Sequence, residues 1–180
     1  LGDEAILEMT LKQIMEVTDR KNITVLSGNK EVTRKKYNID TIDRYNVFSI
    51  LNALRSSDVL IFGGGSLLQD VTSKRSIYYY LCLIRLAKLM NNKIVMLSQG
   101  IGPIISEKSK KAVGSTLSLV DYITVRDKFS KEFLESLGVD KKKIFLSTDP
   151  VINLSEDEDF KYKKANAEKV FAGTVINSND

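Results

Sequence analysis

A short apolar segment that runs directly into three consecutive glycines is the feature that most constrains this chain. Val59–Phe62 has the length and composition of a buried strand, and Gly63, Gly64 and Gly65 follow it without a break. Glycine lets a backbone turn sharply and approach a ligand, because no Cβ stands in the way. Open α/β folds hold anionic groups just beyond the carboxyl end of such a strand. The segment from Gly63 to Asp70 is therefore predicted to be a turn that binds a charged group.

The composition excludes several kinds of chemistry. The 180 residues contain no histidine and a single cysteine, Cys82. No histidine can then act as an acid, a base or a metal ligand, and one cysteine cannot make a zinc site, so we expect no metal. Cys82 falls in an apolar helical pattern and is predicted to be a small core residue.

Charge and hydropathy set the class of protein. The 27 basic and 23 acidic residues leave a net charge of +4, without a basic stripe of interleaved aromatics, so nucleic acid is not an expected partner. We find no signal peptide and no apolar run of membrane-spanning length. A cytoplasmic location is the resulting expectation.

Helical and strand patterns alternate along most of the chain. This alternation predicts a Rossmann-like, doubly wound, mostly parallel α/β sheet over residues 1–150, with helices on both faces. Residues 151–180 are predicted to be a linker and the possible start of a second domain, with Val170–Ile176 as a strand of that other unit. Because Asp3 is expected to cap the first helix, we place the sheet's first strand upstream of Leu1. The predicted strands are Ile23–Leu26, Val59–Phe62, Lys93–Ser98, Tyr122–Val125 and Ile144–Leu146. The later helices are Val47–Leu54, about 76–90, one capped by Ser106 that runs to about Leu119, and one ending at Gly138.

Three polar segments follow presumed strands, and parallel strands bring them to one edge of the sheet. They are Gly63–Asp70, Gln99–Pro103 and Arg126–Ser130. The arginine of the last could hold a carboxylate or phosphate through two hydrogen bonds.

Structural interpretations remain open for each segment. The glycine run could serve close helix–strand packing, and Gln99–Pro103 could be an ordinary turn. Arg126 and Asp127 could form an internal salt bridge, with Asp127 as a helix cap. A dinucleotide fingerprint is not favoured, because Leu68 stands where its last glycine is needed, and no P-loop pattern is present.

Several of these motifs, in this order, resemble the polysaccharide pyruvyl transferase family, most closely its bacterial cell-wall (CsaB-like) branch. The segments that carry the resemblance are Leu1–Leu7, Gly63–Asp70, Ser98–Pro103, Thr124–Asp127, Ser130, Leu137–Val139 and Asp149–Val151.

The resemblance implies a two-domain architecture like that of the GT-B glycosyltransferases. It also implies transfer of pyruvyl, as a ketal, from phosphoenolpyruvate to a sugar of a cell-wall polysaccharide or exopolysaccharide. Phosphoenolpyruvate is then a donor substrate rather than a cofactor, and the acceptor is a polysaccharide or a lipid-linked saccharide. Peripheral membrane association and a homo-oligomer are compatible with this picture. In the cell-wall branch the resemblance implies that the ketal modifies the polysaccharide to which S-layer proteins bind.

The resemblance also suggests site residues. Asp70 would orient or deprotonate an acceptor hydroxyl, and Arg126 would hold the charge of the donor. The expected substrate-binding residues are Asp3, Gly63, Gly64, Gly65, Ser66, Gln69, Gln99, Gly100, Gly102 and Asp127.

This chain departs from the family pattern in its histidine content. The family uses a histidine and arginines in its C-terminal half, and this chain has no histidine, so we expect residues 1–180 to be inactive alone. Two other functions stay open: a nucleotide-sugar glycosyltransferase domain of the same general fold, and a non-catalytic α/β binding module.

Overall fold

A computed structural model describes residues 2–69, 74–147 and 170–172. The expected linker at 151–169 and the residues after 172 lie outside the described residues, so the domain boundary at 150 stays a prediction. Helices and strands follow one another along the chain. They are α1 (Gly2–Met15), β1 (Ile23–Ser27), α2 (Lys30–Tyr37), β2 (Asp40–Asp43), α3 (Val47–Arg55), β3 (Val59–Phe62), β4 (Gly65–Leu68), α4 (Lys74–Leu89), β5 (Lys93–Ile101), α5 (Glu107–Leu117), β6 (Tyr122–Val125), α6 (Lys128–Ser136), β7 (Ile144–Leu146) and β8 (Val170–Ala172).

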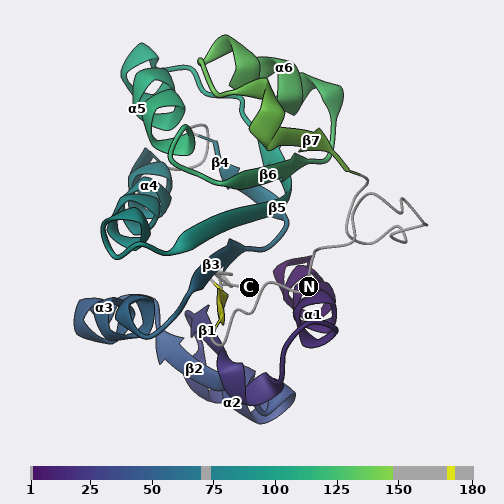
Figure 1. Cartoon of the computed structure of the whole chain (residues 1–180), viewed down its shortest axis with the longest axis vertical. Coiled ribbons are helices and arrows are strands. Elements are labelled where there is room, and N and C mark those ends of the chain that lie inside the picture. Colours follow the sequence, from purple (N-terminus) through teal and green to yellow (C-terminus); the bar gives the residue numbers. More distant parts are fainter. Residues whose placement is uncertain (1, 70–73, 148–169, 173–180) are drawn as a thin grey trace.

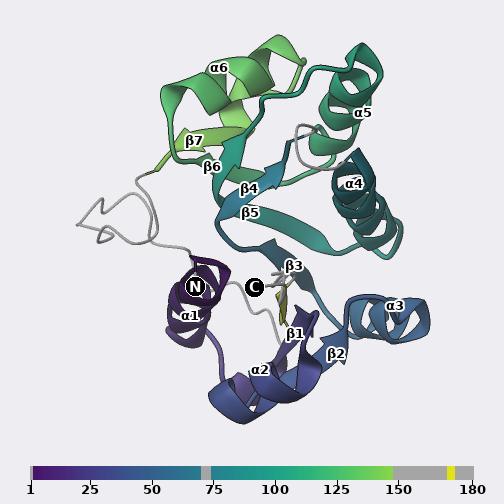
Figure 2. The same ribbon diagram turned by 180° about the vertical axis from the view of Figure 1, so that it is seen from behind.

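All the strands form one parallel sheet in the order β2-β1-β8-β3-β5-β6-β7, with β4 paired to the end of β5. In Figure 1, α3, α4 and α5 lie to the left of the sheet and α1 and α6 to its right, and Figure 2 shows the same division from behind. A parallel sheet with helices on both faces confirms the predicted Rossmann-like class.

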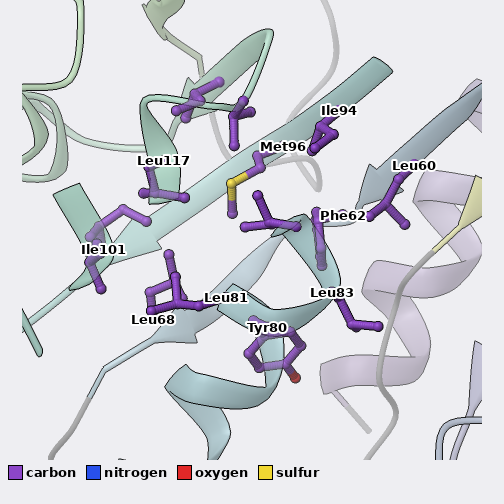
Figure 3. Close-up of a cluster of buried hydrophobic side chains, with 14 of the residues drawn as sticks. Leu60, Phe62, Leu68, Tyr80, Leu81, Leu83, Ile94, Met96, Ile101 and Leu117 are labelled. Carbon is purple, nitrogen blue, oxygen red and sulfur yellow. The ribbon is translucent and has the colours of Figure 1, made fainter. Parts of the chain in front are cut away.

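The main core lies between α4, α5 and the middle strands of the sheet (Figure 3). Phe62 of β3 is fully buried and meets the ring of Tyr80 edge to face, with centroids 6.3 Å apart. Met96 of β5 is also fully buried. Full burial of each such side chain stabilises the fold by about 1.5–3 kcal/mol, so this layer holds the sheet edge that carries the site in place.

Several helices begin at capping residues that the sequence predicts. Ser106 accepts a hydrogen bond from the N–H of Ser109 at the start of α5, and Asp127 does the same for Ser130 at the start of α6. Gly138, just past the end of α6, has a φ of 84°, the left-handed conformation that glycine adopts without strain. These signals depend only on neighbouring residues, so they can be recognised from the sequence.

Two elements and one cap differ from the prediction. The helix α2 and the strand β2 have no predicted counterpart. Of the residues of α2, Thr33 is the buried one, so this helix lacks the apolar stripe that identifies a packed helix. β2 is an edge strand with two aspartates. The first helix starts at Gly2, so Asp3 lies in its first turn and is not its N-cap.

The glycine segment and the segment after Ser98 also differ from the prediction. Gly65–Leu68 is the strand β4, not part of a turn, and β5 runs on to Ile101 instead of ending at Ser98. The reason is mutual pairing, since β4 and the end of β5 satisfy each other's backbone groups.

Cys82 and β8 are further corrections. Cys82 is exposed, because it shares an outward stripe of α4 with Tyr78, Arg85 and Leu89. The strand β8, expected in another unit, pairs with both β1 and β3 inside this sheet.

Candidate functional site

At the carboxyl edge of β3, β5 and β6, the paired strands β4 and β5 both depart from regular strand geometry. β3 and β4 both pair with β5 and are separated by Gly63 and Gly64. Gly65 has a φ of 121°, and Ser98, which precedes its β5 partner Gln99, has a φ of 46°. A positive φ at a residue with a side chain is uncommon outside functional or strained positions, and here it accompanies a register shift between β5 and β6.

Gln99 is buried inside this irregularity. Its side-chain amide donates to the carbonyl oxygens of Gly63 and Leu97, and its residue is completely inaccessible to solvent. Its Oε1 is buried and accepts no hydrogen bond from any described residue. The position supports a structural role for Gln99, which ties β3 to β5, and a role in binding substrate stays a prediction.

Arg126 begins the loop after β6 and reaches back across β5. Its backbone N–H donates to the carbonyl of Gln99, and its Nη2 donates to Oγ of Ser66 at 3.0 Å. The side chain remains 42% exposed, so the guanidinium is held by the protein and open to solvent at once. A fixed, accessible guanidinium is suited to bind a carboxylate or phosphate.

Gly100 lies directly beneath that guanidinium. A Cβ at this position would stand 2.6 Å from both Nε and Nη2 of Arg126. Gly63, Gly100 and Arg126 therefore meet at one edge of the sheet, as predicted.

Asp127 makes both contacts that its structural interpretation predicts, a helix cap and a salt bridge with Arg126. Its Oδ1 caps α6, and its Oδ2 lies 3.6 Å from Nε of Arg126. An exposed ion pair at this distance contributes little to stability, so Asp127 acts here mainly by capping α6 and orienting the guanidinium.

The other predicted site residues lie around this arrangement. Gly63 and Gly64 are buried, and Gly65 and Gln69 are partly exposed. Gly102 has a φ of 90° and packs near the rings of Phe129 and Phe133. Asp70 lies outside the described residues, and the structure describes no side-chain position for Asp3.

Two buried hydroxyls to which the sequence analysis assigned no role support the edge. Thr124 of β6 accepts a hydrogen bond from the N–H of Ser98, and Ser130 of α6 accepts one from the N–H of Ile101. Both satisfy N–H groups of β5 at its irregular end. Their signal in the sequence is weak, because a small hydroxyl residue in an apolar segment is ordinary.

The described part of the chain shows neither a metal-binding cluster nor a membrane-spanning helix. No group of three acidic or cysteine side chains there is arranged to hold a metal ion. None of the helices in residues 2–69 and 74–147 combines the length and the apolar character needed to cross a bilayer.

Comparison with protein families gives one match. The family model described as polysaccharide pyruvyl transferase matches residues 1–179. Comparisons with curated proteins and with solved structures found no match. The matched region spans the glycine segment, Gln99, Gly100 and Arg126, the residues that meet at the carboxyl edge of the sheet. The chain belongs to the polysaccharide pyruvyl transferase family.

Proposed function

We propose that this chain is the portion of a pyruvyltransferase that helps to bind phosphoenolpyruvate at the carboxyl edge of its sheet. The acceptor is a sugar of a cell-wall polysaccharide or exopolysaccharide, as in the CsaB-like branch. The observation that carries the proposal is Arg126, whose guanidinium is anchored by Ser66 and remains open to solvent. The second domain of a GT-B-like architecture would complete the site.

The proposed reaction needs a cation beside the donor. A proton adds to the methylene carbon of phosphoenolpyruvate, and one acceptor hydroxyl attacks the oxocarbenium-like carbon that results. The second hydroxyl then forms the other C–O bond of the ketal as the bond to phosphate breaks. Of the two hydroxyl protons, one balances the proton placed on the methyl group and the other leaves with phosphate. Arg126 would hold the carboxylate or phosphate of the donor through these steps.

Asp70 is the proposed partner of the acceptor hydroxyl. This role rests on its place at the end of the glycine segment, eight positions after Phe62 in the matched family region. A carboxylate there would orient the hydroxyl or take its proton.

A donor competition assay with the full-length protein tests the function. We expect phosphate release from phosphoenolpyruvate in the presence of an acceptor saccharide, and no inhibition by a UDP-sugar. Transfer from the UDP-sugar instead would support the glycosyltransferase alternative. Binding of either donor without turnover would support a non-catalytic module.

Two substitutions in the full-length protein test the residues. Arg126→Lys keeps the charge and loses the planar fork, so the KM for phosphoenolpyruvate should rise more than the KM for the acceptor. Asp70→Asn should lower kcat by roughly 100-fold or more, the usual size of a general-base contribution. Thermal melts should stay close to wild type. Lower melting temperatures with unchanged kinetics would show that both residues only support the fold.

A further inference from the structure

We infer that Gly100 is a positioning residue, whose bare backbone forms the seat in which the guanidinium of Arg126 lies. The inference rests on the proposed function, because the seat matters to the reaction only if Arg126 binds the donor. The three heavy atoms nearest to a Cβ at position 100 would all belong to Arg126: Nε at 2.6 Å, Nη2 at 2.6 Å and Cζ at 2.7 Å. Real side chains do not approach this closely, so any residue other than glycine displaces the guanidinium.

The backbone at this point does not itself require glycine. Gly65 and Gly102, on either side of the site, have positive φ angles, whereas Gly100 does not. Gly100 lies in β5, where an extended conformation suits any residue. Because a Cβ would meet the far end of a flexible side chain, the fold can accommodate alanine while Arg126 cannot keep its position.

Two further contacts set the direction of the guanidinium. Ser66 of β4 accepts from Nη2 at 3.0 Å, and the carboxylate of Asp127 lies 3.6 Å from Nε. Within the described part of the chain, these contacts leave both N–H groups on Nη1 and one on Nη2 for a ligand. Arginine binds carboxylate and phosphate best when its planar fork is aligned with two oxygens. The seat on β5 therefore presents the fork to the donor's anionic group in a fixed orientation.

Gly100→Ala in the full-length protein is the direct test. We expect the KM for phosphoenolpyruvate to rise roughly tenfold or more, because a small misplacement of the Arg126 guanidinium weakens its binding of the donor. The KM for the acceptor should stay within about twofold of wild type, as expected when the lost interaction involves the donor alone. The melting temperature should not change. Ser66→Ala removes one restraint and leaves the seat, so its effect on the same KM should be smaller.

A double-mutant cycle separates positioning from direct contact with substrate. If Gly100 acts only through Arg126, Gly100→Ala should add nothing in a protein that already carries Arg126→Ala. An additional loss in that background would overturn the inference. So would a Gly100→Ala protein without a cooperative melting transition, since the fold itself would then need glycine here.

A crystal structure of the Gly100→Ala protein gives a result independent of activity. We expect the guanidinium to leave Ser66, and a retained hydrogen bond between Arg126 and Ser66 would overturn the inference. If the wild-type protein does not consume phosphoenolpyruvate, the proposed function fails. The position of Arg126 in the variant still decides whether Gly100 provides its seat.

Discussion

The contribution of Gln99 is set at the scale of a single residue. Its amide reaches two carbonyl groups that belong to different strands, Gly63 after β3 and Leu97 within β5. Both carbonyls lie next to the register shifts of β4 and β6 on β5. The buried amide of Gln99 supplies a hydrogen-bond donor to each of them.

Replacing Gln99 by methionine keeps the size of the side chain and removes both donors. We expect the free energy of unfolding to fall by about 1–3 kcal/mol, the usual effect of leaving buried carbonyls unsatisfied. Urea denaturation measures it. Gln13→Met, at a partly buried position of α1, is the matched control and should change stability by less than about 0.5 kcal/mol. Unchanged stability with a raised KM for substrate would instead make Gln99 a ligand-binding residue.

The tyrosines of α4 lie in different environments. Tyr80 packs in the core and Tyr78 is exposed. Tyr79 donates from its hydroxyl to the carbonyl of Arg44 at 2.9 Å. Burial raises the pKa of Tyr79 well above its usual value, so this hydroxyl stays protonated and keeps donating over the ordinary pH range.

At the scale of elements, α5 approaches the C-terminal end of α6 through one small residue. Gly114 of α5 faces the carbonyl group and Cβ of Leu137, the residue that ends α6. A Cβ at position 114 would collide with the backbone oxygen of Leu137. Backbone cannot move aside as a flexible side chain can, so the two helices would have to separate.

Gly114→Ala should therefore destabilise the protein, although alanine favours an isolated helix by about 1 kcal/mol over glycine. We expect a net loss of about 1–3 kcal/mol, as for overpacked interiors. Ser115→Ala, the exposed neighbour on α5, is the control and should be nearly neutral. A gain in thermal stability for Gly114→Ala would show that the helices do not pack as described.

At the scale of the whole molecule, one carboxylate links a helix to two strands at the edge opposite the site. Asp121 precedes β6, accepts from the N–H of Ile94 at 2.9 Å, and pairs with Lys88 of α4 at 3.1 Å and with Lys93 at 3.7 Å. Burial alone would raise the pKa of the Asp121 carboxyl. The hydrogen bonds from Ile94 and Lys88 and the two lysine charges outweigh burial and hold the pKa below its ordinary value of 3.8.

This shift predicts how global stability depends on pH. A carboxyl group with a lower pKa in the folded protein stabilises the fold above its unfolded-state pKa, and that contribution is lost as the pH falls through the folded-state value. Urea midpoints measured from pH 6 down to pH 3 should therefore fall less steeply at the acid end for Asp121→Asn than for wild type. Parallel curves would show that Asp121 contributes no pH-dependent stability.

The sheet as a whole could be predicted only in outline. The alternation of strands and helices, the caps at Ser106 and Asp127 and the stop at Gly138 are local, and the structure confirms each. The charged helix α2 and the edge strand β2 could not be identified, because neither has a strong apolar period. The exposure of Cys82 could not be predicted, because it depends on which stripe of α4 faces the sheet.

The sequence by itself determined the parallel α/β class, the polar segments after three strands and the meeting of Gly63, Gly100 and Arg126 at one edge. These follow from apolar periods and from the rule that parallel strands share their carboxyl edge. Only the tertiary structure decided that β8 lies between β1 and β3, that Gln99 is buried and that Arg126 lies on Gly100 against Ser66. Each of these depends on contacts between residues 26 to 147 positions apart, and no local pattern encodes which distant surfaces meet.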